Sequence, residues 1–342
     1  MLIERLSLAA LLGWLLLSSP CGTALGCLAW QEPSFGDGTA SPLASSAPSK
    51  YEVISPPADL KLDPFYTKYI SASGYPIVAS SQVNDYALRE AAWLVDQMLA
   101  ERPDIREAMI KSGSRLSIIG HNEYTTDLPE WQWMADPKKD GKESTGVSSR
   151  DYWDARARGL GGSEWDPHCS CAEENLLGYK GDPYATECIL IHEFAHNIHL
   201  RGIKRVDAEF DRRLQAAYDA AMAAGLWKGV YASVNSREYF AEGVQSWFSN
   251  NRESDHDHNH VNTREELVAY DPELAKLCRE VFGETELAYT KPGTRLNGHL
   301  EGYDPNAAPE FRWPERLEKA HAAILADAQR RNREAQADKQ PK

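Results

Sequence analysis

The segment His192-Glu-Phe-Ala-His196 constrains the fold of this sequence more than any other feature. Two histidines four residues apart share one face of an α-helix, so both imidazoles can reach a single metal ion. Apolar residues surround the pair: Ile189, Leu190, Ile191, Phe194, Ala195 and Ile198. A helix that is apolar on both sides of its polar residues is buried. The sequence therefore predicts a buried helix over 186–200 that presents two metal ligands to a cleft.

Zinc is the expected occupant of such a histidine pair. It binds imidazole nitrogens at about 2.0 to 2.1 Å, and a catalytic zinc has three protein ligands and one open position for water. Glu193, beside the first histidine, is expected to accept a proton from that water as general base. The third ligand is best supplied by the segment 237–248, REYFAEGVQSWF. In it Glu238 would bind the one zinc ion of each chain, and Glu242, one turn later, would support the ligands.

Both glutamates have a competing interpretation. Asn235 is a good N-cap residue, and Glu238 three residues later would complete a capping box. The alternative for Glu242 is a solvated helix face. The neighbouring apolar residues favour a buried helix, in which an unpaired carboxylate would be costly, and so they favour the ligand. These residues are Tyr239, Phe240, Val244, Trp247 and Phe248.

The pattern HEFAH over 192–196 followed by EYFAE over 238–242 resembles the gluzincin zinc metallopeptidases. Within them it is most similar to the family related to the catalytic domain of anthrax lethal factor. The resemblance covers about residues 186–250, and it implies that Glu238 ligates zinc while Glu242 forms a supporting hydrogen bond. It also implies that Tyr231, seven residues before Glu238, donates a hydrogen bond to the oxyanion or leaving group. The alternative for Tyr231 is an ordinary strand aromatic.

Other polar groups lie outside this set. His199 is about 10 Å along the helix axis from His192, too far to share its ion, so we expect a supporting or packing role. The tract DHDHNH over 255–260 has the composition of a metal-binding tract, but its polar neighbours favour a solvated loop. The segment EEN over 173–175 either lines the cleft or caps a loop.

The N-terminal residues predict export. A charged start, an apolar stretch over 6–17 and small residues up to position 26 have the order of a secretory signal peptide. The apolar stretch has 12 residues, fewer than the roughly 20 that span a bilayer, so no transmembrane span is expected. Cleavage before Cys27 resembles processing at a bacterial lipobox, and the mature chain is either soluble and secreted or lipid-anchored at Cys27.

The domain boundaries follow composition. Residues 1–26 are assigned to the signal peptide and 27–50, rich in Ser, Pro and Gly, to a disordered linker. Residues 51–322 form the expected catalytic domain, and 323–342 a charged helix end or tail. After cleavage the remaining cysteines predict disulfides, because their number is even in an exported chain. These are Cys169, Cys171, Cys188 and Cys278, whose pairing is left open.

Hydrophobic periodicity and capping residues predict most other elements. Helices are expected over 84–99, 103–113, 206–224, 235–248 and 314–336, and after positions 263 and 271, the last ending at Gly283. A strand is expected over 115–120 and an extended segment over 229–234. The helix that carries the histidine pair should stop at Gly202. Residues 121–180, rich in Trp, Gly, Asp and Pro, are expected to form a loop-rich insertion.

Together these features predict an α+β, zincin-like fold with a small sheet beside the histidine helix and a mainly helical C-terminal lobe. The net charge of −14 argues against a nucleic-acid partner. The expected function is that of an extracytoplasmic zinc metallopeptidase acting on peptide or protein substrates. The alternatives are a non-catalytic zinc-containing protein of the cell envelope and a hydrolase of non-peptide amides. The sequence does not indicate an oligomeric state.

Overall fold

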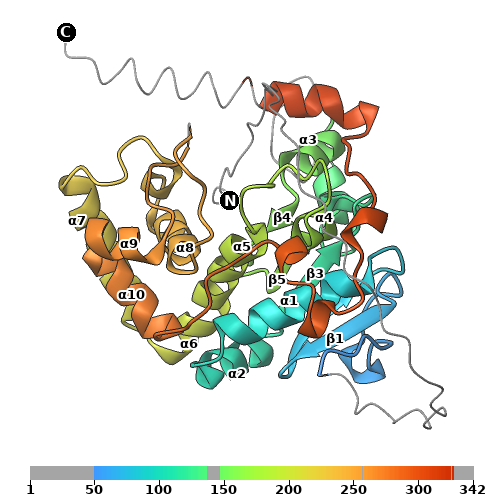
Figure 1. The fold of residues 1–342 in the computed structure, drawn as a ribbon, viewed down its shortest axis with the longest axis horizontal. Coiled ribbons are helices and arrows are strands. Elements are labelled where there is room, and N and C mark those ends of the chain that lie inside the picture. The colour runs from blue at the N-terminus through green and yellow to red at the C-terminus, as the bar shows by residue number, and fades with distance from the viewer. Residues whose placement is uncertain (1–49, 137–146, 256, 325, 327–342) are drawn as a thin grey trace, which may run out of the picture.

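The structure is a computed structural model and describes residues 50–136, 147–255, 257–324 and 326. The predicted signal peptide, nearly all of the predicted linker and most of the predicted C-terminal tail lie outside these ranges. No helix within them is long and apolar enough to cross a membrane. The elements form a mixed α+β fold, as the sequence predicts (Figure 1).

A single five-stranded mixed sheet has the strand order β1-β2-β3-β5-β4 among the described residues. Strands β1 (Lys68–Ala72) and β2 (Tyr75–Ala79) form an antiparallel hairpin. Strands β2, β3 (Arg115–Ile119) and β5 (His168–Ala172) run parallel. The two-residue strand β4 (Gly159–Leu160) pairs antiparallel with β5 at the edge. The strand expected over 115–120 is therefore the central strand.

Helices cover one face of the sheet, where the largest apolar core forms. Helices α1 (Asp85–Met98) and α2 (Pro103–Lys111) connect β2 to β3, as parallel strands require a crossover. Helix α5 (Ile189–Asn197) packs beside β5 on the same face, and the ring of Phe194 contacts that of Tyr75 edge-on at 5.3 Å. The opposite face is covered by Trp131 and by Trp153 of α3 (Ser149–Arg156).

The described parts of the segment 121–180, namely 121–136 and 147–180, contain more regular structure than the predicted loop-rich insertion, and that expectation is wrong for 149–156 and 168–177. They contain α3, β4, β5 and the short helix α4 (Glu173–Leu177). The last four residues of β5 are all buried, because the sheet is covered on both faces. A strand buried on both faces lacks the alternation of polar and apolar residues that marks a strand in a sequence.

The helix that carries the histidine pair does not stop at Gly202. After α5 the chain continues through a π-helix (Ile198–Ile203) into α6 (Lys204–Val206). A Cβ atom at Gly202 would lie 2.5 Å from Cγ2 of Ile105 and 2.9 Å from Cγ of Met109. The glycine therefore lets this helix approach α2 closely instead of ending it.

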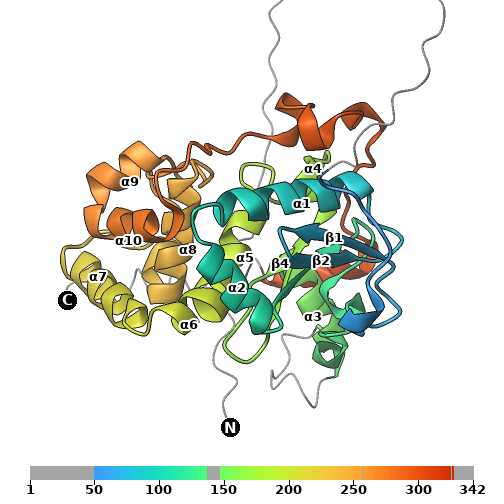
Figure 2. The same cartoon turned by 90° about the horizontal axis from the view of Figure 1, so that it is seen from below.

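The C-terminal lobe is mainly helical, as predicted, and lies on the side of α5 away from the sheet (Figures 1 and 2). It comprises α7 (Phe210–Ala223), α8 (Ser236–Trp247), α9 (Arg264–Tyr270) and α10 (Pro272–Phe282). The expected caps are present: Asn235, Thr263 and Asp271 each accept backbone N–H groups of the helix that follows. The segment expected to be extended over 229–234 instead contains a 3-10 turn (Tyr231–Ser233).

After α10 the chain returns to the sheet side of the molecule (Figure 1). Arg295 and His299 of this returning segment pair with the fully buried Glu90 of α1, and Nε2 of His299 lies 2.6 Å from its Oε2. Residues 315–324 then form a helix that packs with Tyr124 and Ala155. The C-terminal part of the described chain thus packs against α1 and, through its last helix, against Tyr124 and Ala155.

The predicted disulfides are absent among the described cysteines. Cys169, Cys171, Cys188 and Cys278 are all buried free thiols. Cys169 and Cys171 are two residues apart on one strand, which separates their Cα atoms by about 6.7 Å, near the upper limit for a bridge. Burial raises the pKa of each of these two thiols well above its ordinary value. The expectation of disulfides is therefore wrong for these four cysteines, two of which lie on a core strand.

Candidate metal centre

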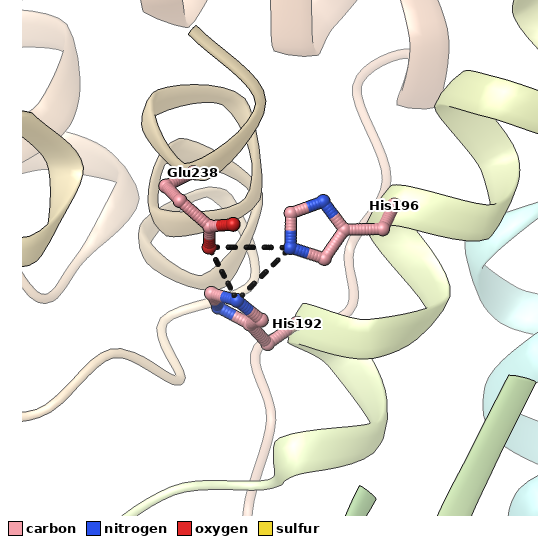
Figure 3. Close-up of side chains that lie close together, drawn as sticks. All are labelled: His192, His196 and Glu238. Atoms are coloured by element: carbon pink, nitrogen blue, oxygen red, sulfur yellow. Dashed lines mark hydrogen bonds and ion pairs between the residues drawn. The ribbon is translucent and has the colours of Figure 1, made fainter. Parts of the chain in front are cut away.

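Helices α5 and α8 bring three potential ligands together (Figure 3). His192 and His196 lie one turn apart on α5, and Glu238 faces them from the first turn of α8. Oε2 of Glu238 is 3.2 Å from Nε2 of His192 and 3.3 Å from Nε2 of His196. The two Nε2 atoms are 3.2 Å apart. Among the described residues, this is the only group of His, Cys, Asp and Glu side chains compact enough to hold a metal ion.

The spacing of the three donor atoms fits a tetrahedral cation. Ligand atoms about 2.0 to 2.2 Å from a zinc ion in tetrahedral geometry lie roughly 3.4 Å from one another. The three observed separations, 3.2, 3.2 and 3.3 Å, are close to that value. The second oxygen of Glu238, Oε1, is buried and has no hydrogen-bond partner in the structure. A cation would compensate this cost of burying a carboxylate.

The cap of α8 explains how Glu238 reaches the histidines. Oδ1 of Asn235 accepts the backbone N–H groups of Arg237 and Glu238 at 2.8 and 3.0 Å. The N-cap that competed with the ligand role is therefore present. The carboxylate of Glu238, however, is directed to the histidines and not back to Asn235. Capping by Asn235 and ligation by Glu238 are thus compatible.

The far side of the His192 ring contacts two more side chains of α8. Nδ1 of His192 lies 2.8 Å from Oε1 of Gln245 and 3.4 Å from Oε1 of Glu242. An Nδ1–H group that donates to Gln245 leaves the lone pair of Nε2 free for a metal. Sequence reasoning assigned the supporting role to Glu242 and missed Gln245. The signal was available, because Glu238, Glu242 and Gln245 recur at helical spacing on one face.

Glu242 also contacts the loop between α8 and α9. Its Oε2 accepts from Nδ2 of Asn251 at 3.0 Å and lies 3.6 Å from Nε2 of His258. Nδ1 of the same histidine lies 2.8 Å from Oδ1 of Asp255. Burial alone would lower the pKa of His258, but these two carboxylates outweigh it and raise the pKa to about 10. His258 is thus a buried partner of Glu242, and the expectation of a solvated loop is wrong at this residue.

Glu193 and the end of strand β4 both lie next to the group of His192, His196 and Glu238. Burial raises the pKa of the Glu193 carboxyl, although the nearby histidines oppose this shift. A carboxylate with a raised pKa is a better proton acceptor near neutral pH. A Cβ atom at Gly161, just beyond β4, would lie 3.0 Å from Oε2 of Glu193 and 2.8 Å from Cβ of His196. The edge of the sheet therefore touches both residues.

Tyr231 lies beside the His192 ring, on the 3-10 turn before α8. The two ring centroids are 6.1 Å apart, and the backbone N–H of Tyr231 donates to the carbonyl oxygen of Asp257 at 2.7 Å. Its hydroxyl is buried and has no hydrogen-bond partner in the structure. Burial raises the pKa of this phenol well above its ordinary value, so the hydroxyl keeps its proton and remains a donor.

The other candidate polar residues lie outside the candidate metal-binding group of His192, His196 and Glu238. Nε2 of His199 contacts Asp211 at 2.7 Å, and its ring packs edge-on against Phe210 and Phe240, so it is a packing histidine. Glu173 accepts backbone N–H groups of Asn84 and His121 at 2.7 and 2.9 Å. Glu174 pairs with the fully buried Arg158. These two glutamates brace loops.

Comparisons with known proteins assign no family to this sequence. No protein-family description and no curated protein sequence matches it. Among solved structures, it is similar to the Pro-Pro endopeptidase PPEP-2 from Paenibacillus alvei, with 17% identity and a TM-score of 0.40. The match covers 60% of this chain and 97% of that chain. Similarity at this level does not establish the lethal factor-like family or transfer an activity.

Proposed function

We propose that this chain is a zinc-dependent peptidase that hydrolyses peptide bonds with an activated water. The observation that carries the proposal is the buried group of His192, His196 and Glu238, whose donor atoms have the spacing of zinc ligands. Glu193 and Tyr231 lie beside that group, and a site that only bound metal would need neither.

Each residue then has a distinct role. His192, His196 and Glu238 would hold the zinc ion, which would act as a Lewis acid and lower the pKa of water toward neutrality. Glu193 accepts the proton of the attacking water and returns it to the leaving nitrogen. Tyr231 donates its hydroxyl proton in a hydrogen bond to the carbonyl oxygen as negative charge develops there.

The sheet edge supports a peptide substrate. Strand β4 pairs with β5 on one side and has no strand partner on the other among the described residues. Both residues of β4 are buried, so a substrate peptide would meet this edge of the sheet at the half-buried Gly161 that follows them. An extended peptide that hydrogen-bonds to a strand edge is held by its backbone. Because Gly161 at the end of β4 touches Glu193 and His196, such a peptide would pass the metal-binding group. An exported location follows from the signal peptide expected over 1–26 and belongs to the same proposal.

The test is the variant Glu193→Gln, which removes the proton acceptor and leaves the three ligands in place. The purified wild-type protein loaded with zinc should cleave members of a peptide library, as read by mass spectrometry. Glu193→Gln should bind zinc with unchanged stoichiometry and show no cleavage. A variant that cleaves as fast as wild type would refute the mechanism. A wild-type protein that binds zinc but cleaves nothing would support a non-catalytic zinc protein or a hydrolase of other amides.

A further inference from the structure

The amide of Gln245 connects His192 to a buried carboxylate that the catalytic scheme does not use. Oε1 of Gln245 lies 2.8 Å from Nδ1 of His192, and Nε2 of Gln245 donates to Oε2 of Glu187 at 2.6 Å. Glu187 precedes α5, whereas Gln245 lies near the end of α8. Both side chains are buried, with exposed fractions of 3% and 0%. Solvent therefore does not compete for this connection.

The second oxygen of Glu187 is held by an arginine. Oε1 of Glu187 accepts from Nε of Arg252 at 2.6 Å and also contacts its Nη2 at 2.5 Å. Arg252 is 7% exposed and lies on the loop between α8 and α9. A guanidinium only donates hydrogen bonds, so the oxygen that faces it must be an acceptor. Arg252 thus fixes one end of a chain of hydrogen bonds that runs through Glu187 and Gln245 to His192.

The direction of every bond in this chain follows from donor and acceptor chemistry. A carboxylate paired with an arginine offers only acceptors, so the NH₂ group of Gln245 must face Glu187. The carbonyl oxygen of the same amide must then face His192. Only a protonated Nδ1 can donate to that oxygen, so in a neutral imidazole the lone pair lies on Nε2, which is directed at Glu238 and His196.

We propose that Glu187, held by Arg252, is a positioning residue that sets the tautomer of His192 through Gln245. This inference rests on the proposed function, because it assigns His192 as a zinc ligand through Nε2. Partners that fix the orientation and tautomer of a ligating histidine contribute about 10- to 100-fold to metal affinity. Glu187 acts without touching the metal or the substrate.

The variant Glu187→Gln should reverse the donor-to-acceptor direction of the hydrogen bonds that connect position 187 through Gln245 to His192. Arg252 still requires an acceptor, so the introduced amide turns its oxygen to Arg252 and its NH₂ group to Gln245. Gln245 then turns its own oxygen to position 187 and its NH₂ group to His192. A donor facing Nδ1 opposes a proton there, whereas Oε1 of Glu242, 3.4 Å from the same nitrogen, still accepts one. The balance therefore shifts toward the tautomer with a proton on Nε2, which cannot ligate zinc. Zinc affinity should fall about 10- to 100-fold.

Exchanging the residues at positions 187 and 245 should restore the original direction of the hydrogen bond from His192. In the double variant Glu187→Gln/Gln245→Glu, the carboxylate at position 245 accepts both from Nδ1 of His192 and from the amide at position 187. That amide still offers its oxygen to Arg252, and the number of charges is unchanged. A purely structural role for Glu187 predicts no such rescue, because neither residue regains its native partner.

The matched control is Glu90→Gln. Glu90 is also a fully buried glutamate paired with an arginine, Arg295, but it lies on α1 and has no connection to His192. This control separates the general cost of removing a buried carboxylate from an effect on the metal ligand. Thermal unfolding of all variants identifies any that do not fold.

Two measurements test the proposal on the purified protein. Zinc affinity is measured by competition with a chelator. The tautomer of His192 is measured in the zinc-free protein from the ¹⁵N shifts of its imidazole nitrogens, at a pH at which these shifts show a neutral ring. The proposal expects weaker zinc binding and an Nε2–H tautomer in Glu187→Gln, recovery of both in the double variant, and wild-type values in Glu90→Gln. Wild-type affinity in Glu187→Gln, or a double variant no better than the single one, would overturn it.

The outcomes also separate this proposal from the proposed function. Zinc binding that responds to Glu187 as expected, in a wild-type protein that cleaves no peptide, would refute the peptidase and retain the positioning role. Cleavage together with a zinc affinity that is independent of Glu187 would retain the peptidase and refute the positioning role. A wild-type protein that binds no zinc would overturn both.

Discussion

Replacing Gly161 by alanine adds one methyl group where strand β4 meets the metal-binding group. The new Cβ atom would lie 2.8 Å from Cβ of His196, 3.0 Å from its Cδ2 and 3.0 Å from Oε2 of Glu193. Ordinary van der Waals contacts of a Cβ atom are 3.4–4 Å long, so the contact with His196 is short by at least about 0.6 Å. The contacts involve a proposed metal ligand and the proposed general base.

The expected free-energy cost of the added methyl group follows from this overlap. An added methyl group in a packed site costs about 1 to 3 kcal/mol, because the neighbours must move or leave their preferred rotamers. A catalytic arrangement tolerates displacements of only about 0.5 Å. We therefore expect Gly161→Ala to lower the zinc affinity, and kcat/KM for a cleaved peptide, by about 10- to 100-fold, which corresponds to about 1.4 to 2.8 kcal/mol.

The assay combines chelator competition for zinc with cleavage of a peptide selected from the library. Gly293→Ala is the matched control, because no atom lies within 4 Å of the position of its new Cβ. It should show wild-type zinc affinity and wild-type cleavage. Wild-type values in Gly161→Ala would refute the conclusion that the strand edge touches His196 and Glu193.

Three further predictions concern the helices and loops around the site. The raised pKa of His258, about 10, means that its stabilisation is fully present below its unfolded-state value of about 6.5 and is lost as the pH rises toward 10. In urea unfolding of the zinc-free proteins at pH 6, the free energy of unfolding of His258→Gln should therefore be lower than that of wild type by up to about 4 to 5 kcal/mol, and this difference should shrink toward pH 10. A difference that does not depend on pH would contradict the pairing with Glu242 and Asp255. Gly202→Ala should lower the free energy of unfolding by about 1 to 3 kcal/mol because its methyl group would overlap Ile105 and Met109, and a more stable variant in the same assay would contradict the close approach of α2. Tyr231→Phe should keep its zinc and lose about 10²- to 10³-fold in kcat, since the phenol is proposed to act on the developing negative charge; an unchanged kcat would remove it from the mechanism.

Local signals in the sequence predicted much of the helical part of the fold. Asn84, Asn235, Thr263 and Asp271 each cap a helix where expected, because capping depends on a side chain and the backbone a few residues further along. The shared helix face of His192 and His196 could likewise be predicted, because it depends only on their spacing of four residues. Glu238 could be proposed as their partner because the buried character of its helix was visible in the sequence.

Features that depend on distant contacts were not predicted. Strands β4 and β5 are too short and too deeply buried to show a strand period, so the segment over 121–180 resembled a loop. Gly202 resembled a helix stop, since its partners Ile105 and Met109 belong to a helix about 100 residues earlier. The connection between Gln245 and Glu187 likewise joins residues 58 positions apart. No local pattern marks such pairs.

The central claim is that His192, His196 and Glu238 bind one zinc ion, and metal content tests it most directly. Elemental mass spectrometry of the purified wild-type protein should find about one zinc per chain, and the same value in His199→Gln, which changes a packing histidine of the same helical segment. His192→Ala and Glu238→Ala should retain much less zinc while remaining folded. A wild-type protein without zinc, or a full complement of zinc in Glu238→Ala, would contradict the claim.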